Sequence, residues 1–126
     1  MLRIDRVSPA LVRMTIDRPP ANALTLDLIQ ALADALVRFG EEAEAPAVIL
    51  TGAGQRFFSA GGDIREIETQ ADIALPRMRV FHHLLTVLEN YRCPLLCAVK
   101  DNNAPVQLIG DGHIPDEKDS KLYQVS

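Results

Sequence analysis

The sequence predicts an α/β fold with parallel strands and flanking helices, and three observations point to it. Two short strands joined by a turn open the chain. Strand-like and helix-like patterns then alternate up to about residue 100. The later strands are short apolar runs, which is typical of strands that are buried in a parallel sheet. Because strands that follow each other across a helix usually pair in parallel, we expect the helices to flank one sheet.

The first two strands are predicted at residues 4–7 and 11–17, with Ser8-Pro9-Ala10 as the turn between them. Apolar side chains at every second position from Val12 to Ile16 give the second strand one apolar face. Arg18-Pro19-Pro20 ends this strand, because proline has no N–H to donate to a neighbouring strand. We therefore expect an antiparallel hairpin.

A helix is predicted at residues 26–39, with Thr25 as its N-cap, Asp27 in its first turn and Gly40 as its C-terminal stop. One stripe of this helix is apolar and consists of Ile29, Leu32, Leu36 and Phe39. Pro46 then precedes a buried strand at residues 47–51, which Gly52 ends. The helix is thus amphipathic and is expected to cover the sheet.

A short helix is predicted to begin near Asp63, and a longer one covers residues 73–91 with Pro76 in its first turn. The longer helix has two apolar stripes, which are Met78, Phe81, Leu85 and Leu88 on one side and Val80, Leu84, Val87 and Tyr91 on the other. Such a helix is expected to be covered on both sides, by its own domain or by a partner subunit. Cys93-Pro94 ends it, and residues 95–99 form a further buried strand.

Composition excludes several classes of protein. Hydrophobic residues make up 48% of the chain and charged residues 24%, and the net charge is -4, so no basic face for nucleic acid is expected. The apolar runs are too short to span a bilayer, and the N-terminus lacks the apolar core of a signal peptide, so we expect a cytoplasmic protein. The spacing of Cys93 and Cys97 fits neither a redox pair nor a zinc site, and we predict no metal site.

The segment Ala60-Gly61-Gly62 carries very little side-chain bulk, so a ligand can approach its backbone closely. Asp63 begins a helix, and an N–H at Gly62 or Asp63 can donate to a developing enolate or thioester oxyanion. One such donor contributes roughly 3 to 4 kcal/mol of transition-state stabilisation. The residues alone leave open whether the glycines bind a ligand or form a tight turn.

Two other sites are excluded around this segment. Gly52-x-Gly54 has Phe57 where a dinucleotide-binding fingerprint requires its third glycine. Phe57 also stands where a nucleophile elbow centred on Ser59 requires glycine, so Ser59 is predicted to be a small packing residue.

Four segments of the chain resemble motifs of the enoyl-CoA hydratase/isomerase (crotonase) family over about residues 1–100. Phe58 to Ile64 resembles F-[SCA]-A-G-[AG]-D-[LI], and Asp17 to Leu24 resembles D-R-P-x-x-N-A-L. The strand and glycine at 48–52 have the expected spacing, and Cys93 to Lys100 resembles K-P-x-I-A-A-V-x. The resemblance implies a ClpP/crotonase-like ββα spiral, incomplete in this chain.

The resemblance also implies a site for acyl-CoA. Gly62 matches the residue whose backbone N–H forms the first arm of the oxyanion hole. Six further positions match residues that contact coenzyme A. The pantetheine and adenine side is matched by Ala60, Asp63 and Ile64. The loop that contacts the coenzyme from above is matched by Pro20, Ala21 and Ala23. Coenzyme A is then part of the thioester substrate, with no permanently bound cofactor. The resemblance further implies a homo-oligomer, a trimer or hexamer, and a role in fatty acid metabolism.

Other polar residues near these motifs receive more ordinary roles. Asn22 is predicted to fix its turn and Leu24 to pack in the core. For Arg18, binding of a phosphate and a solvated charge remain open alternatives. His82 and His83 are assigned to the surface or packing of their helix, and His113 receives no role.

The family pattern breaks after Lys100. Pro105 or Val106 stands where G-x-A-x-G-[GA]-G would supply the second oxyanion glycine, and Glu117 is the only glutamate of the tail. Proline has no N–H to donate. We therefore expect a partial domain at 1–100 and a divergent tail at 101–126, loop or disordered, with at most a short strand at 106–109.

The break has a consequence for activity. Without the second oxyanion donor and the catalytic acids, we expect an impaired or inactive hydratase or isomerase. A non-catalytic module for acyl-CoA binding or oligomer assembly is the alternative. The acyl-chain specificity and the choice between hydratase, isomerase and hydrolase stay open.

Overall fold

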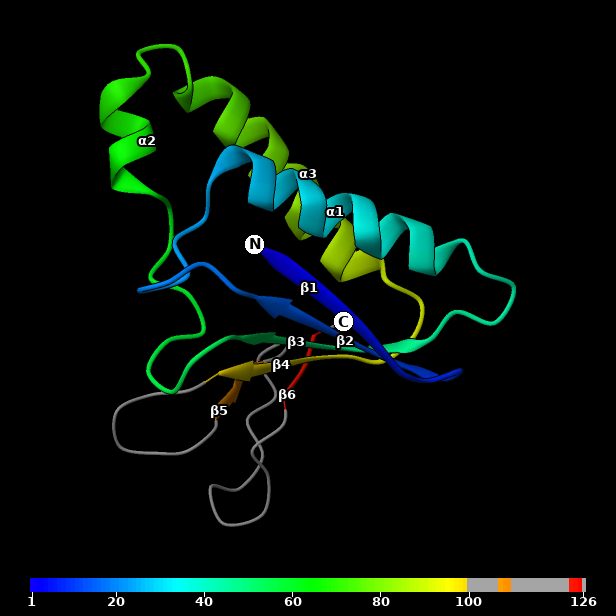
Figure 1. Cartoon of the computed structure of the whole chain (residues 1–126). Helices are drawn as coiled ribbons and strands as arrows, with labels where there is room; N and C mark the ends of the chain where they lie inside the picture. Colours follow the sequence, from blue (N-terminus) through cyan, green and yellow to red (C-terminus); the bar gives the residue numbers. More distant parts are fainter. Residues whose placement is uncertain (100–106, 110–122, 126) are drawn as a thin grey trace.

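A computed structural model of the chain describes residues 1–99, 107–109 and 123–125. The elements in chain order are β1 (Leu2–Ser8), β2 (Leu11–Ile16), α1 (Leu26–Gly40), β3 (Ala47–Gly52), α2 (Ile64–Thr69), α3 (Ala74–Asn90), β4 (Leu95–Val99), β5 (Gln107–Ile109) and β6 (Tyr123–Val125). Helices α1 and α3 lie side by side along one face of the sheet, and α2 stands apart beyond its end (Figure 1). The predicted α/β class with flanking helices is confirmed.

The sheet is mixed, with the order β1-β2-β3-β4-β5, and β6 also pairs with β4. Strands β1 and β2 form the predicted antiparallel hairpin. Strands β2, β3 and β4 are parallel, and their register aligns Met14 with Leu50 and Leu50 with Cys97. The parallel pairing that the alternation of strands and helices predicted is therefore present.

The core lies between this sheet and α1. Strands β2, β3 and β4 contribute Val12, Met14, Ile16, Val48, Leu50 and Leu95, and α1 contributes Leu28, Ile29, Leu32 and Leu36. The Oγ1 atom of Thr25 accepts a hydrogen bond from the N–H of Leu28 at 3.2 Å, which confirms Thr25 as the N-cap. Gly40 is the last residue of α1 rather than the first one beyond it, and Glu41 caps the helix.

Helix α3 packs against the core mainly with one of its two apolar stripes. Leu84 on this stripe is buried, and Val80 and Val87 pack against the core cluster, as does Leu88 from the end of the other stripe. On the other stripe Met78 is 69% exposed, and Phe81 and Leu85 are also exposed. Within the described residues, the chain leaves Met78, Phe81 and Leu85 uncovered, so cover of this side by a partner subunit stays a prediction.

Two short strands follow β4. Strand β5 falls inside the predicted strand at 106–109, whereas β6 is a second strand that the sequence analysis did not expect. Pro105, Val106, His113 and Glu117 lie outside the described residues, as does most of the predicted tail. Among the described residues, no helix combines the length and the apolar character that crossing a membrane requires.

Candidate functional site

Two loops meet at one end of the sheet. Residues 17–25 follow β2, residues 53–63 follow β3, and both loops leave the same edge because these strands are parallel neighbours. Three backbone hydrogen bonds join them: the N–H of Leu24 donates to Gly61 O at 2.7 Å, that of Asp63 to Leu24 O at 3.0 Å, and that of Ala60 to Ala21 O at 2.9 Å. The two sequence motifs, far apart in the chain, therefore form one surface.

Asn22 holds this junction together. Its side chain accepts from the N–H of Arg18 at 2.9 Å and donates to Ala53 O at 3.0 Å and Phe57 O at 3.1 Å. Asn22 is 2% exposed and has a φ of 56°, a left-handed conformation that asparagine tolerates better than most residues. The predicted structural role of Asn22 is confirmed, and Leu24 packs against the core as expected.

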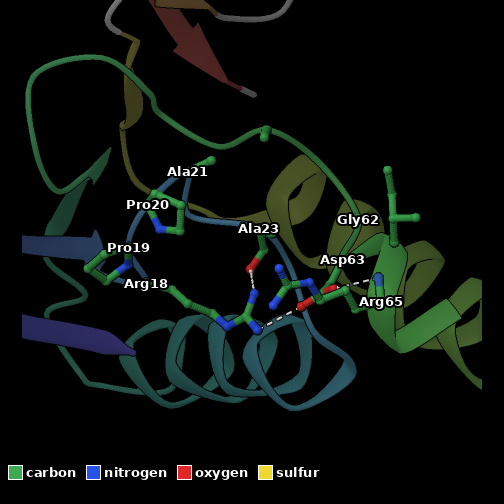
Figure 2. A pocket seen from close by; sticks show the side chains of 10 residues that line it. Arg18, Pro19, Pro20, Ala21, Ala23, Gly62, Asp63 and Arg65 are labelled. Carbon is green, nitrogen blue, oxygen red and sulfur yellow. Dashed lines mark hydrogen bonds and ion pairs between the residues drawn. The ribbon is translucent and has the colours of Figure 1, made fainter. Parts of the chain in front are cut away.

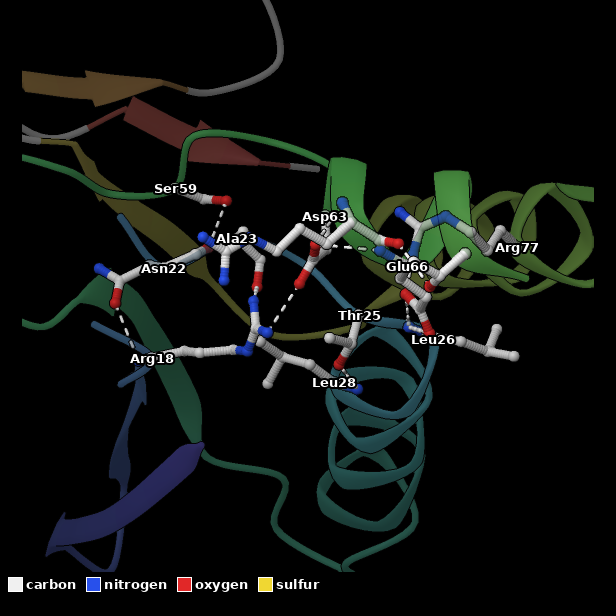
Figure 3. Close-up of polar contacts among 12 residues, drawn as sticks. Arg18, Asn22, Ala23, Thr25, Leu26, Leu28, Ser59, Asp63, Glu66 and Arg77 are labelled. Atoms are coloured by element: carbon white, nitrogen blue, oxygen red, sulfur yellow. Dashed lines mark hydrogen bonds and ion pairs between the residues drawn. The ribbon is translucent and has the colours of Figure 1, made fainter. Parts of the chain in front are cut away.

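Ser59 does more than fill space. Its hydroxyl donates to Asn22 O at 2.7 Å and accepts from the N–H of Gly61 at 3.0 Å, so it links the two loops (Figure 3). The prediction of a mere packing residue is therefore wrong, because a hydroxyl at this place has a donor and an acceptor within reach.

A cavity of about 340 Å³ opens between the two loops and the start of α2 (Figure 2). Its lining consists of Arg18, Pro19, Pro20, Ala21, Ala23, Ala60, Gly62, Asp63, Ile64 and Arg65. All seven residues predicted for the site are among them. Most of the lining residues have small or apolar side chains, so a ligand can approach the backbone of both loops. Neither Pro19 nor Arg65 was predicted to line a binding site.

The backbone N–H of Gly62 faces away from the neighbouring loop. Leu24 pairs with Gly62 as an isolated parallel bridge, and Gly61 O and the N–H of Asp63 make its two hydrogen bonds. The N–H of the residue between them then points to the opposite side. No acceptor for it is present among the described residues.

The alternative donor considered from the sequence, the N–H of Asp63, is occupied by Leu24 O. The N–H groups of Arg65 and Glu66, in the first turn of α2, donate to Oδ1 of Asp63 at 2.9 and 3.2 Å. Of the N–H groups at Gly62 and Asp63, only that of Gly62 is therefore available to a ligand.

Asp63 and Arg18 form an ion pair at the cavity wall. Nη2 of Arg18 lies 2.6 Å from Oδ2 of Asp63, and Nη1 of Arg18 donates to Ala23 O at 3.2 Å (Figures 2 and 3). The N–H of Glu66 and the Arg18 guanidinium hold the pKa of Asp63 below its usual value. The Arg18 side chain is about two-thirds buried, at 32% exposure, so the simple solvated charge considered for it is wrong.

A second polar group, which the sequence analysis missed, joins the starts of three helices. Oε2 of Glu66 accepts from the N–H of Leu26 at 3.0 Å and lies 2.5 Å from Nη1 of Arg77 (Figure 3). Arg77 is 9% exposed. The core-facing position of Arg77 could have been predicted from the sequence, since Arg77 lies three residues before Val80 on the stripe that packs against the core.

A smaller cavity of about 230 Å³ lies beside the first. Its lining consists of Leu24, Ile29, Gly62, Arg77, Met78 and Phe81. Gly62 lines both cavities.

The histidines and cysteines among the described residues form no comparable site. His82 and His83 lie exposed on α3, as predicted. Cys93 and Cys97 are free thiols, and burial raises the pKa of Cys97 to about 11. Among the described residues, no group of three or more His, Cys, Asp or Glu side chains could hold a metal ion.

Known proteins resemble this chain in sequence and in fold. Carnitinyl-CoA dehydratase of Salmonella arizonae is 41% identical over 64 residues, which are 51% of this chain and 24% of that protein. The structure of enoyl-CoA hydratase from Bacillus anthracis matches with a TM-score of 0.72 at 28% identity, over 79% of this chain and 40% of that chain. An enoyl-CoA hydratase/isomerase from Mycobacterium paratuberculosis matches with a TM-score of 0.67 at 32% identity, over 78% and 40%.

The chain thus spans less than half the length of these relatives. The model of the enoyl-CoA hydratase/isomerase family nevertheless matches residues 6–104, which is most of this sequence. The solved relatives have the same α/β arrangement as the part of the chain described above. This chain belongs to the enoyl-CoA hydratase/isomerase (crotonase) family.

Proposed function

We propose that the chain binds CoA thioesters in the cavity of about 340 Å³ and polarises the thioester carbonyl with the backbone N–H of Gly62. One observation carries the proposal: the seven positions that match the acyl-CoA site of the family all line this one cavity. They come from two loops and the start of a helix, so the fold and not their spacing brings them together.

The Gly62 N–H suits a thioester oxygen for two reasons. It has no acceptor among the described residues, and the hydrogen bonds on either side of it fix its direction. A fixed donor stabilises the negative charge that develops on the carbonyl oxygen when an enolate forms, by roughly 3 to 4 kcal/mol. This is the chemistry that hydration or double-bond migration next to a thioester requires.

The rest of the cavity suits the coenzyme. Pro20, Ala21 and Ala23 on one loop, with Ala60 and Ile64 opposite, offer small apolar surfaces for a pantetheine chain. Asp63 keeps Arg18 at the wall, and Arg65 is exposed beside it. The two guanidinium groups against one carboxylate leave a net positive charge, which favours phosphate groups.

A second candidate function is a non-catalytic acyl-CoA binding or oligomer-assembly module. Pro105 and Val106, which stand where the family has its second oxyanion glycine, favour it. For this reason we expect hydration or isomerisation by this chain to be weak or absent. The exposed stripe of Met78, Phe81 and Leu85 on α3 supports assembly into a homo-oligomer, and the family resemblance implies a trimer or hexamer. A cytoplasmic location and a role in fatty acid metabolism stay predictions.

Calorimetry with butyryl-CoA, combined with infrared difference spectroscopy of its ¹³C-labelled thioester carbonyl, tests the proposal. We expect saturable binding and a shift of the carbonyl stretch to lower frequency in the complex. Binding without that shift would support the coenzyme site but contradict the polarisation of the carbonyl by Gly62. No heat at high micromolar ligand would contradict the proposal as a whole. The rate of crotonyl-CoA hydration relative to buffer decides between the enzyme and the non-catalytic module.

A further inference from the structure

We propose that Glu66 and Arg77 are positioning residues for the N–H of Gly62. They hold the peptide unit between Gly61 and Gly62 so that its N–H, and not its carbonyl, faces the ligand. This proposal rests on the function proposed above and adds two residues to it. Neither side chain lines the cavity of about 340 Å³, so both act through the backbone of Gly62.

The peptide unit between Gly61 and Gly62 has a donor at one end and an acceptor at the other. Among the described residues only the Pro19-Pro20 bond is cis, so this unit is trans, and its carbonyl and its N–H point in opposite directions. Gly61 O accepts from the N–H of Leu24 at 2.7 Å. The direction of the Gly62 N–H therefore depends on the contact between Leu24 and Gly61.

Glycine on both sides makes this peptide unit unusually free to rotate. Without a Cβ atom at Gly61 or Gly62, the unit can exchange the directions of its carbonyl and its N–H at little steric cost. The turned unit would present a carbonyl oxygen to the thioester oxygen and repel it. Polarisation of a thioester therefore requires contacts that keep the N–H turned toward the ligand.

Glu66 provides the first of these contacts. Its Oε2 and Oε1 atoms accept from the N–H of Leu26 at 3.0 and 3.2 Å. Leu26 is two residues from Leu24, whose N–H and carbonyl make the two hydrogen bonds on either side of Gly62. The N–H of Glu66 also donates to Oδ1 of Asp63 at 3.2 Å. These contacts close a ring from Gly62 through Glu66 back to Leu24.

Arg77 packs directly beside Gly62. Its Nη2 atom lies so close that a Cβ atom on this glycine would be 2.7 Å away, and its Nη1 atom lies 2.5 Å from Oε2 of Glu66. The side chains of Arg77 and Glu66 are only 10% and 13% exposed. A planar guanidinium that a carboxylate holds in place therefore restricts the movement of a residue that has no side chain of its own.

The pair should affect one ligand contact selectively. It should strengthen binding where the ligand offers a carbonyl oxygen to Gly62, because a donor that already points at the oxygen does not have to be turned. The contacts to the coenzyme come from other residues of the larger cavity, so they should not change. A merely structural role of the pair would instead weaken the binding of all ligands alike.

Calorimetry with two ligands of nearly the same size tests the proposal. Butyryl-CoA offers a thioester carbonyl, and S-butyl-CoA has a methylene group in its place. On the 126-residue chain we expect butyryl-CoA to bind about 2- to 10-fold more tightly, which is the net value of one hydrogen bond. Infrared difference spectroscopy of the ¹³C-labelled carbonyl reports on the same contact independently of affinity.

Two variants change the pair in different ways. Glu66→Leu combined with Arg77→Met removes both charges together, so neither is left buried without its partner. Arg77→Lys keeps a positive charge for Glu66 but lacks the planar guanidinium beside Gly62. We expect the preference for butyryl-CoA to be lost in the first variant and reduced in the second, and the carbonyl stretch to move back toward that of the free ligand. S-butyl-CoA should bind within a few-fold of its affinity for the unaltered chain.

A matched control changes the same residue types on the same two helices. Glu68→Leu combined with Arg79→Met, both at exposed positions, should keep the preference and the carbonyl shift. A full preference and a full shift in either variant of the pair overturn the proposal and leave the role of Gly62 standing. An equal loss of affinity for both ligands also overturns it, because that loss reports a structural role. If the unaltered chain shows neither preference nor shift, the role proposed for Gly62 fails and this proposal fails with it.

Discussion

The Nη2 atom of Arg77 lies close to Gly62, so that a Cβ atom on this glycine would be only 2.7 Å from it. Gly61, one residue earlier, is required for another reason, since its φ of 98° lies in the left-handed region. The two glycines of the motif are therefore needed for different reasons. Gly61 adopts a left-handed backbone conformation, and Gly62 leaves space beside the buried guanidinium of Arg77.

Gly62→Ala should destabilise the chain by about 1–3 kcal/mol, because the added methyl group displaces the Arg77 guanidinium from Glu66. The same change should weaken acyl-CoA binding. Urea unfolding and calorimetry measure the two effects. Gly40→Ala is the matched control, because its Cβ would meet only the Tyr91 ring, at 3.7 Å. An unchanged unfolding midpoint for Gly62→Ala would show that Arg77 moves freely.

Glu66→Gln should cost about 3 kcal/mol of unfolding free energy, because it leaves the buried charge of Arg77 without its carboxylate. The hydrogen bond to the N–H of Leu26 can survive, so the loss reports mainly on the ion pair. Glu68→Gln, exposed on the same helix, should change stability by less than about 0.5 kcal/mol. A double-mutant cycle with Arg77→Met isolates the coupling, and a coupling near zero would contradict the prediction.

Asn22→Ala should destabilise the chain by about 2–4 kcal/mol and weaken acyl-CoA binding, because three hydrogen bonds that hold the loops together are lost. Alanine also tolerates the φ of 56° poorly. Asn22→Gly removes the same side chain without that strain, so it should be about 1 kcal/mol more stable than Asn22→Ala. Chemical denaturation of the two variants separates the side-chain contribution from the backbone contribution.

Stability should fall as the pH rises from about 10 to 12, partly through Tyr91. Burial raises the pKa of Tyr91 from 10.0 to about 12, so the unfolded chain loses this proton before the folded protein does. The contribution is complete below pH 10 and is lost as the pH rises toward 12. Tyr91→Phe should flatten this decline, and it should cost about 1–2 kcal/mol at neutral pH because Pro46 O loses its donor. Cys97, whose pKa is also raised, accounts for part of the decline that remains.

The ionisation of Asp63 should also make the stability of the folded chain depend on pH, in the acid range. Its pKa is lowered, chiefly by the N–H of Glu66, so its stabilisation is complete above its ordinary value of 3.8 and is lost as the pH falls through the lowered pKa. Asp63→Asn should therefore be less sensitive to acid than the unaltered chain. Identical acid-unfolding curves would show that the carboxylate gains nothing from its cap and its ion pair.

Much of the fold was predictable because the local signals agree with the tertiary structure. Alternation in β2, the Thr25 cap of α1 and the continuous apolar run of β3 each specify one element, and the alternation of strands and helices predicts their parallel pairing. For the outer stripe of α3, the sequence left open whether the chain itself or a partner subunit covers it, and the described residues of the chain do not. Periodicity shows which side chains are apolar, but it does not show whether a neighbouring element is there to cover them.

The candidate site was predictable only in part. Its backbone and small residues follow from the motifs, and the fold places them around one cavity. The ion pairs of Arg18 with Asp63 and of Glu66 with Arg77 were not predictable, because each joins residues that only the packing of loops and helices brings together. The bridging role of Ser59 was missed for the same reason. Long-range polar contacts leave no periodic pattern in the sequence.

The parallel pairing of β2, β3 and β4 also has a consequence for folding kinetics. Met14 meets Leu50, and Leu50 meets Cys97, only after the whole segment between each pair, including a helix, has been brought back across the sheet. The hairpin of β1 and β2 is local and can form early, whereas each parallel contact requires a long loop to close first. Such a high contact order slows folding relative to a helical bundle of equal length. Closure of the β2–α1–β3 unit, which also joins the two loops of the site, is one of these non-local steps.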